Sequence, residues 1–215
     1  EAWDDKTAKA RLADFEKRCK GSPSLAERNQ ALDELAAGAH KSLVKTLVRV
    51  VETDKAVVIK KRAVELLGNQ PRNVANPAIR KLLASGAANS NPPVQAELVR
   101  ALARCGYESK QWKDVEELFE SDYDNARIPV HEAILDLVIE HKEKAALPLL
   151  LRNFDEPSAE NVHDASNPPA EYWKARWHAW AAWKGKVKAA LTAITGQTFS
   201  SAAEAKAWLA KNLRK

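Results

Sequence analysis

Apolar residues recur along this sequence at intervals that match the turn of an α-helix, and one helical pattern returns four times. The four segments are LAERNQALDELAAG (25–38), AVVIKKRAVELLG (56–68), VQAELVRALARCG (94–106) and PVHEAILDLVIEH (129–141). When they are superimposed, Ala31, Ala63, Ala101 and Ala133 share one position, at separations of 32, 38 and 32 residues. A small residue at a fixed point lets a neighbouring helix approach closely. The repeat therefore predicts helices that pack on one another at these alanines.

A second set of helical segments alternates with the first. It comprises residues 42–52, 77–85, 112–121 and 145–154. Alternating apolar and polar runs bounded by hairpin turns, which would indicate strands, do not occur. Two helices per unit at this period are typical of α-solenoids, in which each helix pair contacts its neighbours. The sequence predicts an all-α fold.

Local signals mark where the helices begin and end. Ser24 with Glu27, and Ser201 with Glu204, have the spacing of a capping box. Asn-Pro pairs at 76–77, 91–92 and 167–168 predict helix starts with proline at the first helical position. Six of the seven glycines follow an apolar-periodic stretch, where a left-handed residue often ends a helix: Gly21, Gly38, Gly68, Gly86, Gly106 and Gly196. The seventh, Gly185, is a candidate bend or break within a helix.

The segment AIRKLLASGAANSNPPVQAELVRALARCG (78–106) resembles a HEAT repeat, with an apolar first helix, an Asn/Pro turn, and Val, Arg and Ala along the second helix. Residues 43–68 resemble one as well, with Asp54 in the turn. The resemblance covers residues 24–155, although Glu132 stands where Arg62 and Arg100 stand in the better-matched units. It implies a right-handed α-α superhelix, a HEAT-like solenoid of about four to five helix pairs.

The last segment, ALTAITGQTFSSAAEAKAWLAKN (190–212), is similar to a closing segment of bacterial HEAT-like proteins, many of which are exported. The first residue is Glu1 and the chain has no methionine, so removal of a signal peptide would fit this expectation of export. The predicted organisation is one continuous structural domain. It has an N-terminal helix and HEAT-like helix pairs at residues 1–154, a polar, proline-rich loop at 155–169 and tryptophan-rich basic capping helices at 170–215.

The sequence contains no motif for catalysis or metal binding. The histidines are scattered without ligand spacing: His40, His131, His141, His163 and His178. A glycine-rich phosphate loop and a GxSxG motif are missing, and no apolar run is long enough to span a bilayer. Two cysteines, Cys19 and Cys105, are too few for a disulfide framework and are interpreted as partly buried thiols; a single disulfide would require an exported protein. We predict no enzymatic activity, no cofactor, no metal ion and no membrane span.

Arg62 and Arg100 occupy the same position of the repeat. The favoured interpretation is that they bind carboxylates and carbonyls of the adjacent turn and stabilise the helix stack. The alternative is that a ladder of such residues binds acidic groups of a partner.

Four of the seven tryptophans lie within residues 171–194. At about 100° per residue, Trp173, Trp177, Trp180 and Trp183 fall on one apolar stripe of a helix. We predict that this helix packs against the preceding repeat, with Trp177 and Trp180 at the centre of the stripe. Basic residues at its margins make the helix a secondary binding surface. The predicted partner-binding residues are Trp173, Arg176, Trp183, Lys184, Lys186 and Lys188.

Two functions follow from these features. The favoured one is a non-catalytic scaffold that binds another protein, or a neighbouring domain of a longer chain. The alternative is a DNA-binding or DNA-repair protein, because some bacterial HEAT-like proteins are DNA glycosylases. Basic residues are concentrated in residues 170–215, with nine Lys or Arg against two Glu, whereas residues 1–169 hold 25 bases and 27 acids. Because DNA binding needs basic residues along successive repeats, the charge distribution favours the scaffold.

Overall fold

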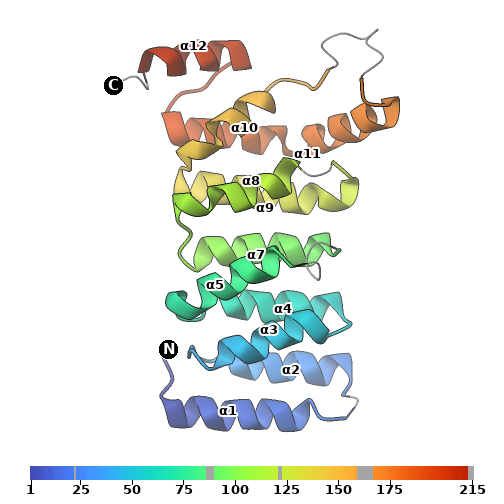
Figure 1. Cartoon of the computed structure of the whole chain (residues 1–215), viewed down its shortest axis with the longest axis vertical. Coiled ribbons are helices and arrows are strands. Elements are labelled where there is room, and N and C mark those ends of the chain that lie inside the picture. Colours follow the sequence, from blue (N-terminus) through green and yellow to red (C-terminus); the bar gives the residue numbers. More distant parts are fainter. Residues whose placement is uncertain (22, 86–89, 121–122, 159–166, 213–215) are drawn as a thin grey trace. The chain divides into compact units, whose positions relative to one another are not determined.

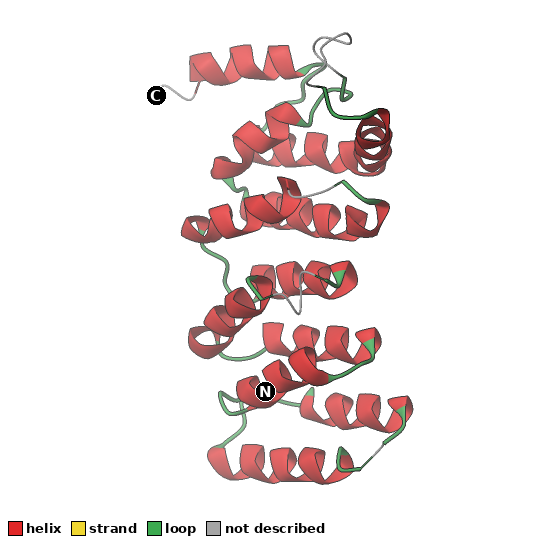
Figure 2. Ribbon diagram, turned by 45° about the vertical axis from the view of Figure 1, so that its right-hand side comes forward, coloured by secondary structure: helices red, strands yellow, loops and turns green. Residues whose placement is uncertain are grey.

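The computed structural model describes residues 1–21, 23–85, 90–120, 123–158 and 167–212. Within these residues it has eleven α-helices and three short 3-10 helices, and it has no strand beyond an isolated parallel bridge between Ala2 and Ala39 (Figures 1 and 2). The prediction of an all-α fold is confirmed. The contacts divide the chain into two compact units, Glu1–Tyr107 and Glu108–Lys215. This division differs from the predicted one, in which residues 1–154 form a single array of helices.

The first unit has two layers of helices. Its elements are α1 (Asp5–Arg18), α2 (Leu25–Leu35), α3 (Leu43–Thr53), α4 (Val57–Gly68), α5 (Arg72–Leu83) and α7 (Pro92–Arg104). Helices α2, α4 and α7 contact one another in sequence and form one layer. The other layer consists of α1, α3 and α5, which also contact one another in order (Figure 1). The two predicted sets of helices therefore lie in separate layers of this unit.

The second unit has fewer regular pairs and one long helix. Its α-helices are α8 (Trp112–Glu120), α9 (Ile128–His141), α10 (Leu147–Arg152), α11 (Ala170–Thr195) and α12 (Ala202–Asn212). The 3-10 helices Ser109–Gln111, Asn125–Arg127 and Lys144–Ala146 precede α8, α9 and α10. Helix α11 packs on α9 and α10, and α12 packs on α10. The helix predicted at 145–154 is shorter in the structure, where it covers Leu147–Arg152, and its proline lies at the helix start.

The alanines that define the repeat are core residues. Ala31, Ala63, Ala101 and Ala133 are at most 2% exposed. The α4–α7 contact shows why the position is small, because a Cβ added at Gly68 would lie 3.1 Å from the Cα of Ala101. The backbones of these two helices therefore approach closely, and the prediction that Ala63 and Ala101 are buried is confirmed.

Two of the predicted helix starts have the expected caps. At α2, Glu27 N donates to Ser24 Oγ at 3.2 Å and Ser24 N donates to the Glu27 carboxylate at 2.7 Å, which completes the capping box. At α7, the Asn91 side chain accepts a hydrogen bond from Val94 N at 3.3 Å.

The start of α12 has only half of the predicted box. Ser201 Oγ accepts from Glu204 N at 3.2 Å, but the Glu204 carboxylate accepts from Ser200 N at 2.7 Å instead of from Ser201 N. The reciprocal half of the box has moved one residue toward the N-terminus. The cap still holds the Glu204 side chain at the helix start.

The other two Asn-Pro predictions are wrong. Pro77 lies inside α5, which begins one and a half turns earlier at Arg72, and Asn76 is 7% exposed. The Asn76 amide donates to the carbonyl of Gly106 at 3.2 Å, so tertiary packing uses this side chain in place of a cap. Helix α11 begins at Ala170 after Pro169, which lies at the N-cap position without a side-chain cap.

The glycines serve two different purposes. Gly21, Gly106 and Gly196 have positive φ and end helices as predicted. Gly38 and Gly68 do not have a positive φ, although Gly68 is the last residue of α4. A Cβ at Gly38 would lie 2.1 Å from Trp3 Nε1, and one at Gly68 would lie 3.1 Å from the Cα of Ala101, so these two glycines permit close approach of neighbouring groups. Helix α11 continues through Gly185 without a break, and Gly86 lies outside the described residues.

Candidate partner-binding surfaces

The apolar stripe of α11 is buried only in its C-terminal part. Trp180 is 8% exposed and Trp183, Val187 and Leu191 are fully buried, whereas Trp177 is 47% exposed. The prediction that Trp177 lies at the buried centre of the stripe is wrong. Its indole Nε1 donates to the Glu156 carboxylate, so the ring lies on the surface beside the segment that follows α10. Helical spacing gave the direction of the side chain, but it did not show whether another helix lies opposite.

Trp183 is the largest fully buried side chain of the described residues. Its ring lies 5.3 Å from the ring of Phe119 on α8 and 6.2 Å from the ring of His131 on α9, with both pairs near edge-to-face. The prediction that Trp183 lies at an accessible margin and binds a partner is therefore wrong. It joins α11 to the core of the second unit.

Arg176 lies among aromatic rings near the start of α11. Its guanidinium carbon is 5.2 Å from the ring centre of Tyr123 and 6.0 Å from that of Trp173, which are cation–π distances. Burial raises the pKa of Tyr123, and the neighbouring Arg176 charge opposes this shift. A pocket of about 660 Å³ beside this group is lined by Arg152, Asp155, Glu156, Trp173, Arg176 and Lys206, among others. Trp173 and Arg176, both predicted to bind a partner, thus lie close together near the start of α11.

The three predicted lysines of α11 make contacts within their own unit. Lys184 Nζ lies 4.6 Å from the ring centre of Trp180, and Lys188 Nζ lies 5.4 Å from that of Phe154. Lys186 forms an ion pair of 2.6 Å with Asp136 on α9. Lys184 thus covers one aromatic ring of α11, while Lys186 and Lys188 link the helix to its neighbours. They give the lysines a structural role in addition to any role in binding.

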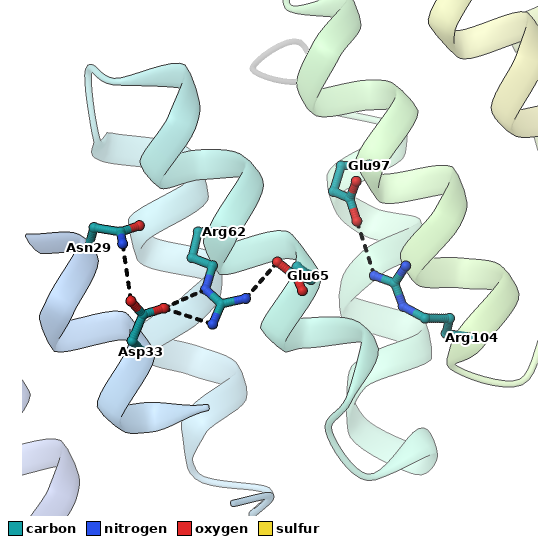
Figure 3. Close-up of polar contacts among 6 residues, drawn as sticks. All are labelled: Asn29, Asp33, Arg62, Glu65, Glu97 and Arg104. Atoms are coloured by element: carbon teal, nitrogen blue, oxygen red, sulfur yellow. Dashed lines mark hydrogen bonds and ion pairs between the residues drawn. The ribbon is translucent and has the colours of Figure 1, made fainter. Parts of the chain in front are cut away.

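The first unit carries a second polar surface, on the layer of α2, α4 and α7. We call it the charged ladder, and its members are Asn29, Asp33, Arg62, Glu65, Glu97, Arg100 and Arg104. Figure 3 shows all of them except Arg100. Arg62 on α4 bonds the Asp33 carboxylate on α2 at 2.7 and 2.9 Å and the Glu65 carboxylate at 2.7 Å. Asn29 donates to Asp33 at 3.1 Å. Arg62 bonds carboxylates, as the favoured interpretation predicted, but these lie on α2 and on α4 itself instead of in the adjacent turn.

Arg100 makes a different set of contacts from Arg62. It bonds Glu97 of its own helix at 3.3 Å, and Arg104 bonds the other oxygen of the same carboxylate at 3.1 Å. A groove of about 450 Å³ lies beside these residues, lined by Asn29, Val58, Lys61, Arg62, Glu65, Glu97, Arg100 and Arg104. Sequence reasoning missed Glu97 and Arg104. Their spacing from Arg100, three and four residues along one helix, was the available signal.

Apolar side chains are exposed beside the charged ladder. Leu25 on α2 is 49% exposed, and Val57 and Val58 at the start of α4 are 37% and 55% exposed. Leu25 lies one turn before Asn29, and Val58 lies one turn before Arg62, so each helix presents an apolar residue next to its polar ones. Apolar residues rimmed by charged groups are typical of protein-binding surfaces.

The described residues contain no group of three His, Cys, Asp or Glu side chains placed to hold a metal ion. His163 and Asp164 of the predicted loop lie outside the described part of the chain. No helix in the described ranges has the length and apolar character needed to cross a membrane. Comparison of the chain with protein-family models, with curated proteins and with solved structures gave no match.

Both cysteines are free thiols, with Cys105 buried and Cys19 half-buried. Burial raises the pKa of both thiols, so less thiolate is present at a given pH than in an unfolded chain. Since the thiolate is the reactive form, we expect both cysteines to react more slowly with iodoacetamide at about pH 8 in the folded protein than in denaturant. Mass spectrometry of timed samples measures this. Equal rates in both conditions would contradict the buried positions.

Proposed function

We propose that this chain is a non-catalytic scaffold of the HEAT-repeat type, which binds a partner protein or a neighbouring domain of a longer chain. The proposal includes a right-handed superhelix of helix pairs as its architecture. It is supported by the alternation of two helix layers in the first unit and by the buried alanine at one fixed position of each repeat. Both features also agree with the HEAT-like sequence pattern of residues 43–68 and 78–106.

The observation that carries the binding role is the composition of the layer formed by α2, α4 and α7. It combines the charged ladder with exposed Leu25, Val57 and Val58. A surface on which exposed aliphatic groups lie beside ion pairs offers both hydrophobic and polar contacts, as protein partners require. Fold alone does not identify a partner, so the proposal rests on this surface.

The same surface makes DNA binding the weaker proposal. A protein that binds DNA neutralises phosphates with Lys and Arg along its contact face. In the charged ladder, Arg62 is already bonded to two carboxylates, and Arg100 and Arg104 share a third. A phosphate backbone that runs along all three helices would meet the carboxylates of Asp33, Glu65 and Glu97 between the arginines, so the layer lacks the continuous row of bases that a duplex requires.

Site-specific crosslinking tests the proposal. A photoreactive amino acid in place of exposed Val58 is expected to give a covalent adduct with one protein in the native host. The matched control places the same group at Lys17, which is exposed on α1, and is expected to give no such adduct. An adduct of the same mass from both positions, or none from Val58, would contradict the α2–α4–α7 layer as the binding surface.

A further inference from the structure

We propose that the groove between α4 and α7 binds an acidic segment of the partner protein, with Arg100 and Arg104 as the receptor for its carboxylates. This inference rests on the proposed function and specifies the chemistry of the partner. It follows from a comparison of Arg62 with Arg100, which occupy equivalent positions of the repeat but have different surroundings.

Carboxylates occupy matched positions on α2 and α4. Asp33 and Glu65 each lie two residues after the repeat alanine of their helix, and both bond Arg62. By the same pattern, Arg100 would bond Glu65 of the preceding helix and an acid two residues after Ala101. Glu65 instead bonds Arg62, and the second position holds Ala103. Arg100 therefore lacks both carboxylates that neutralise its counterpart.

In the described part of the chain, Glu97 is the one carboxylate that remains for Arg100. Glu97 is shared by Arg100 and Arg104, and its side chain is only 12% exposed, whereas each arginine side chain is 38% exposed. A guanidinium carries several N–H donors in a planar fork. Among the described residues, Arg100 and Arg104 each give one hydrogen bond, to Glu97. Both groups thus present further donors to solvent beside a carboxylate that balances only one of their two charges.

The position of Arg104 depends on a close approach between helices. A Cβ added at Gly68 would lie 3.2 Å from Arg104 Nε. The guanidinium therefore lies over the last residue of α4, where the absence of a side chain leaves room for it. Its place over Gly68 limits the positions of Arg104, which lowers the entropy lost when its remaining donors bind a ligand.

The rest of the groove is also rich in basic residues. Its lining includes four bases, Lys61, Arg62, Arg100 and Arg104, against the carboxylates of Glu65 and Glu97, and Arg62 also pairs with Asp33. Three carboxylates therefore stand against four bases. Among the described residues, Lys61 has no carboxylate partner. The excess of positive charge favours an anionic ligand, and Val58, which is 55% exposed in the same groove, favours one that also carries an apolar group. A peptide with glutamates or aspartates around an aliphatic residue meets both requirements.

Fluorescence anisotropy tests this inference. The probe is a fluorescein-labelled peptide in which glutamates flank a central leucine, and the reference probe has glutamines in their place. We expect the acidic peptide to bind and the glutamine peptide to bind at least about tenfold more weakly. Arg100→Gln and Arg104→Gln are each expected to weaken binding about tenfold, as for loss of a charge-assisted hydrogen bond. Lys45→Gln, the same charge change on exposed α3, should change affinity less than about twofold.

Glu97→Gln is the decisive variant, because it removes the carboxylate that competes with the ligand. We expect it to strengthen binding of the acidic peptide by about threefold or more, while Glu52→Gln, an equal charge change on exposed α3, does not. Thermal melts of each variant establish that it is folded. No binding of the acidic peptide by the folded protein, or no gain from Glu97→Gln, overturns the inference.

The outcomes separate this inference from the proposed function. If Val58 crosslinks to a protein but the acidic peptide does not bind, the scaffold role stands and the acidic partner is wrong. If neither occurs, both are wrong. If a random-sequence duplex DNA binds more tightly than the peptide, and Arg100→Gln and Arg104→Gln weaken that binding equally, the groove binds phosphate and the inference is overturned.

Discussion

Replacing Trp183 with alanine is expected to lower the free energy of unfolding by about 3–5 kcal/mol, the range for truncation of a large aromatic residue in a packed core. Trp183 is fully buried and its ring contacts Phe119 and His131. Removing the indole leaves a cavity among α8, α9 and α11 that these helices can fill only in part. Urea and thermal denaturation followed by far-ultraviolet circular dichroism measure the loss.

Trp177→Ala is the matched control on the same helix. This ring is 47% exposed and its polar atom bonds Glu156 at the surface. Its loss is expected to cost less than about 1 kcal/mol, because little apolar area returns to water. Equal losses for the two variants would contradict the orientation of α11. A loss of partner binding without a loss of stability in Trp177→Ala would add this residue to the binding surface.

Ala101→Leu is expected to destabilise the first unit by about 1–3 kcal/mol through overpacking. Ala101 is fully buried at the α4–α7 contact, where the backbones approach so closely that a Cβ on Gly68 would lie 3.1 Å from its Cα. A larger side chain must therefore separate the two helices or adopt a strained rotamer. Melts of the variant in urea and on heating measure the change.

The control for this prediction is Ala10→Leu. Ala10 lies on α1 and is exposed, so the same enlargement meets solvent and is expected to change stability by less than about 0.5 kcal/mol. An unchanged midpoint for Ala101→Leu would mean that the alanine register does not mark the contact between helices.

The sequence alone was enough to predict the features that depend on neighbouring residues in one helix. Apolar periodicity predicted the all-α class, the small residue at each repeat predicted the buried positions of Ala63 and Ala101, and Ser24 with Glu27 predicted a capping box that is present. These features are local, because a helix fixes the direction of each side chain about its axis and a cap needs only the first turn.

The tertiary structure decided what lies opposite each side chain. Trp177 and Trp183 fall on one stripe by spacing, yet one is exposed and the other is buried. Asn76 resembled a cap but reaches the Gly106 carbonyl from inside α5. In these cases the sequence fixes the direction of a side chain, while the helix that packs against it determines whether that direction leads to solvent or to the core.

The candidate binding surface was predictable only in part for the same reason. The equivalence of Arg62 and Arg100 was visible in the repeat, but their partners were not. Arg62 forms ion pairs with Asp33 and Glu65, whereas Arg100 and Arg104 both pair with Glu97. An ion pair between helices depends on the length of the side chains and on the distance between the helices. That distance is determined by residues that lie far apart in the sequence. Helical periodicity determined which residues face outward, and only the packing of α2, α4 and α7 determined which charges remained without a full complement of partners.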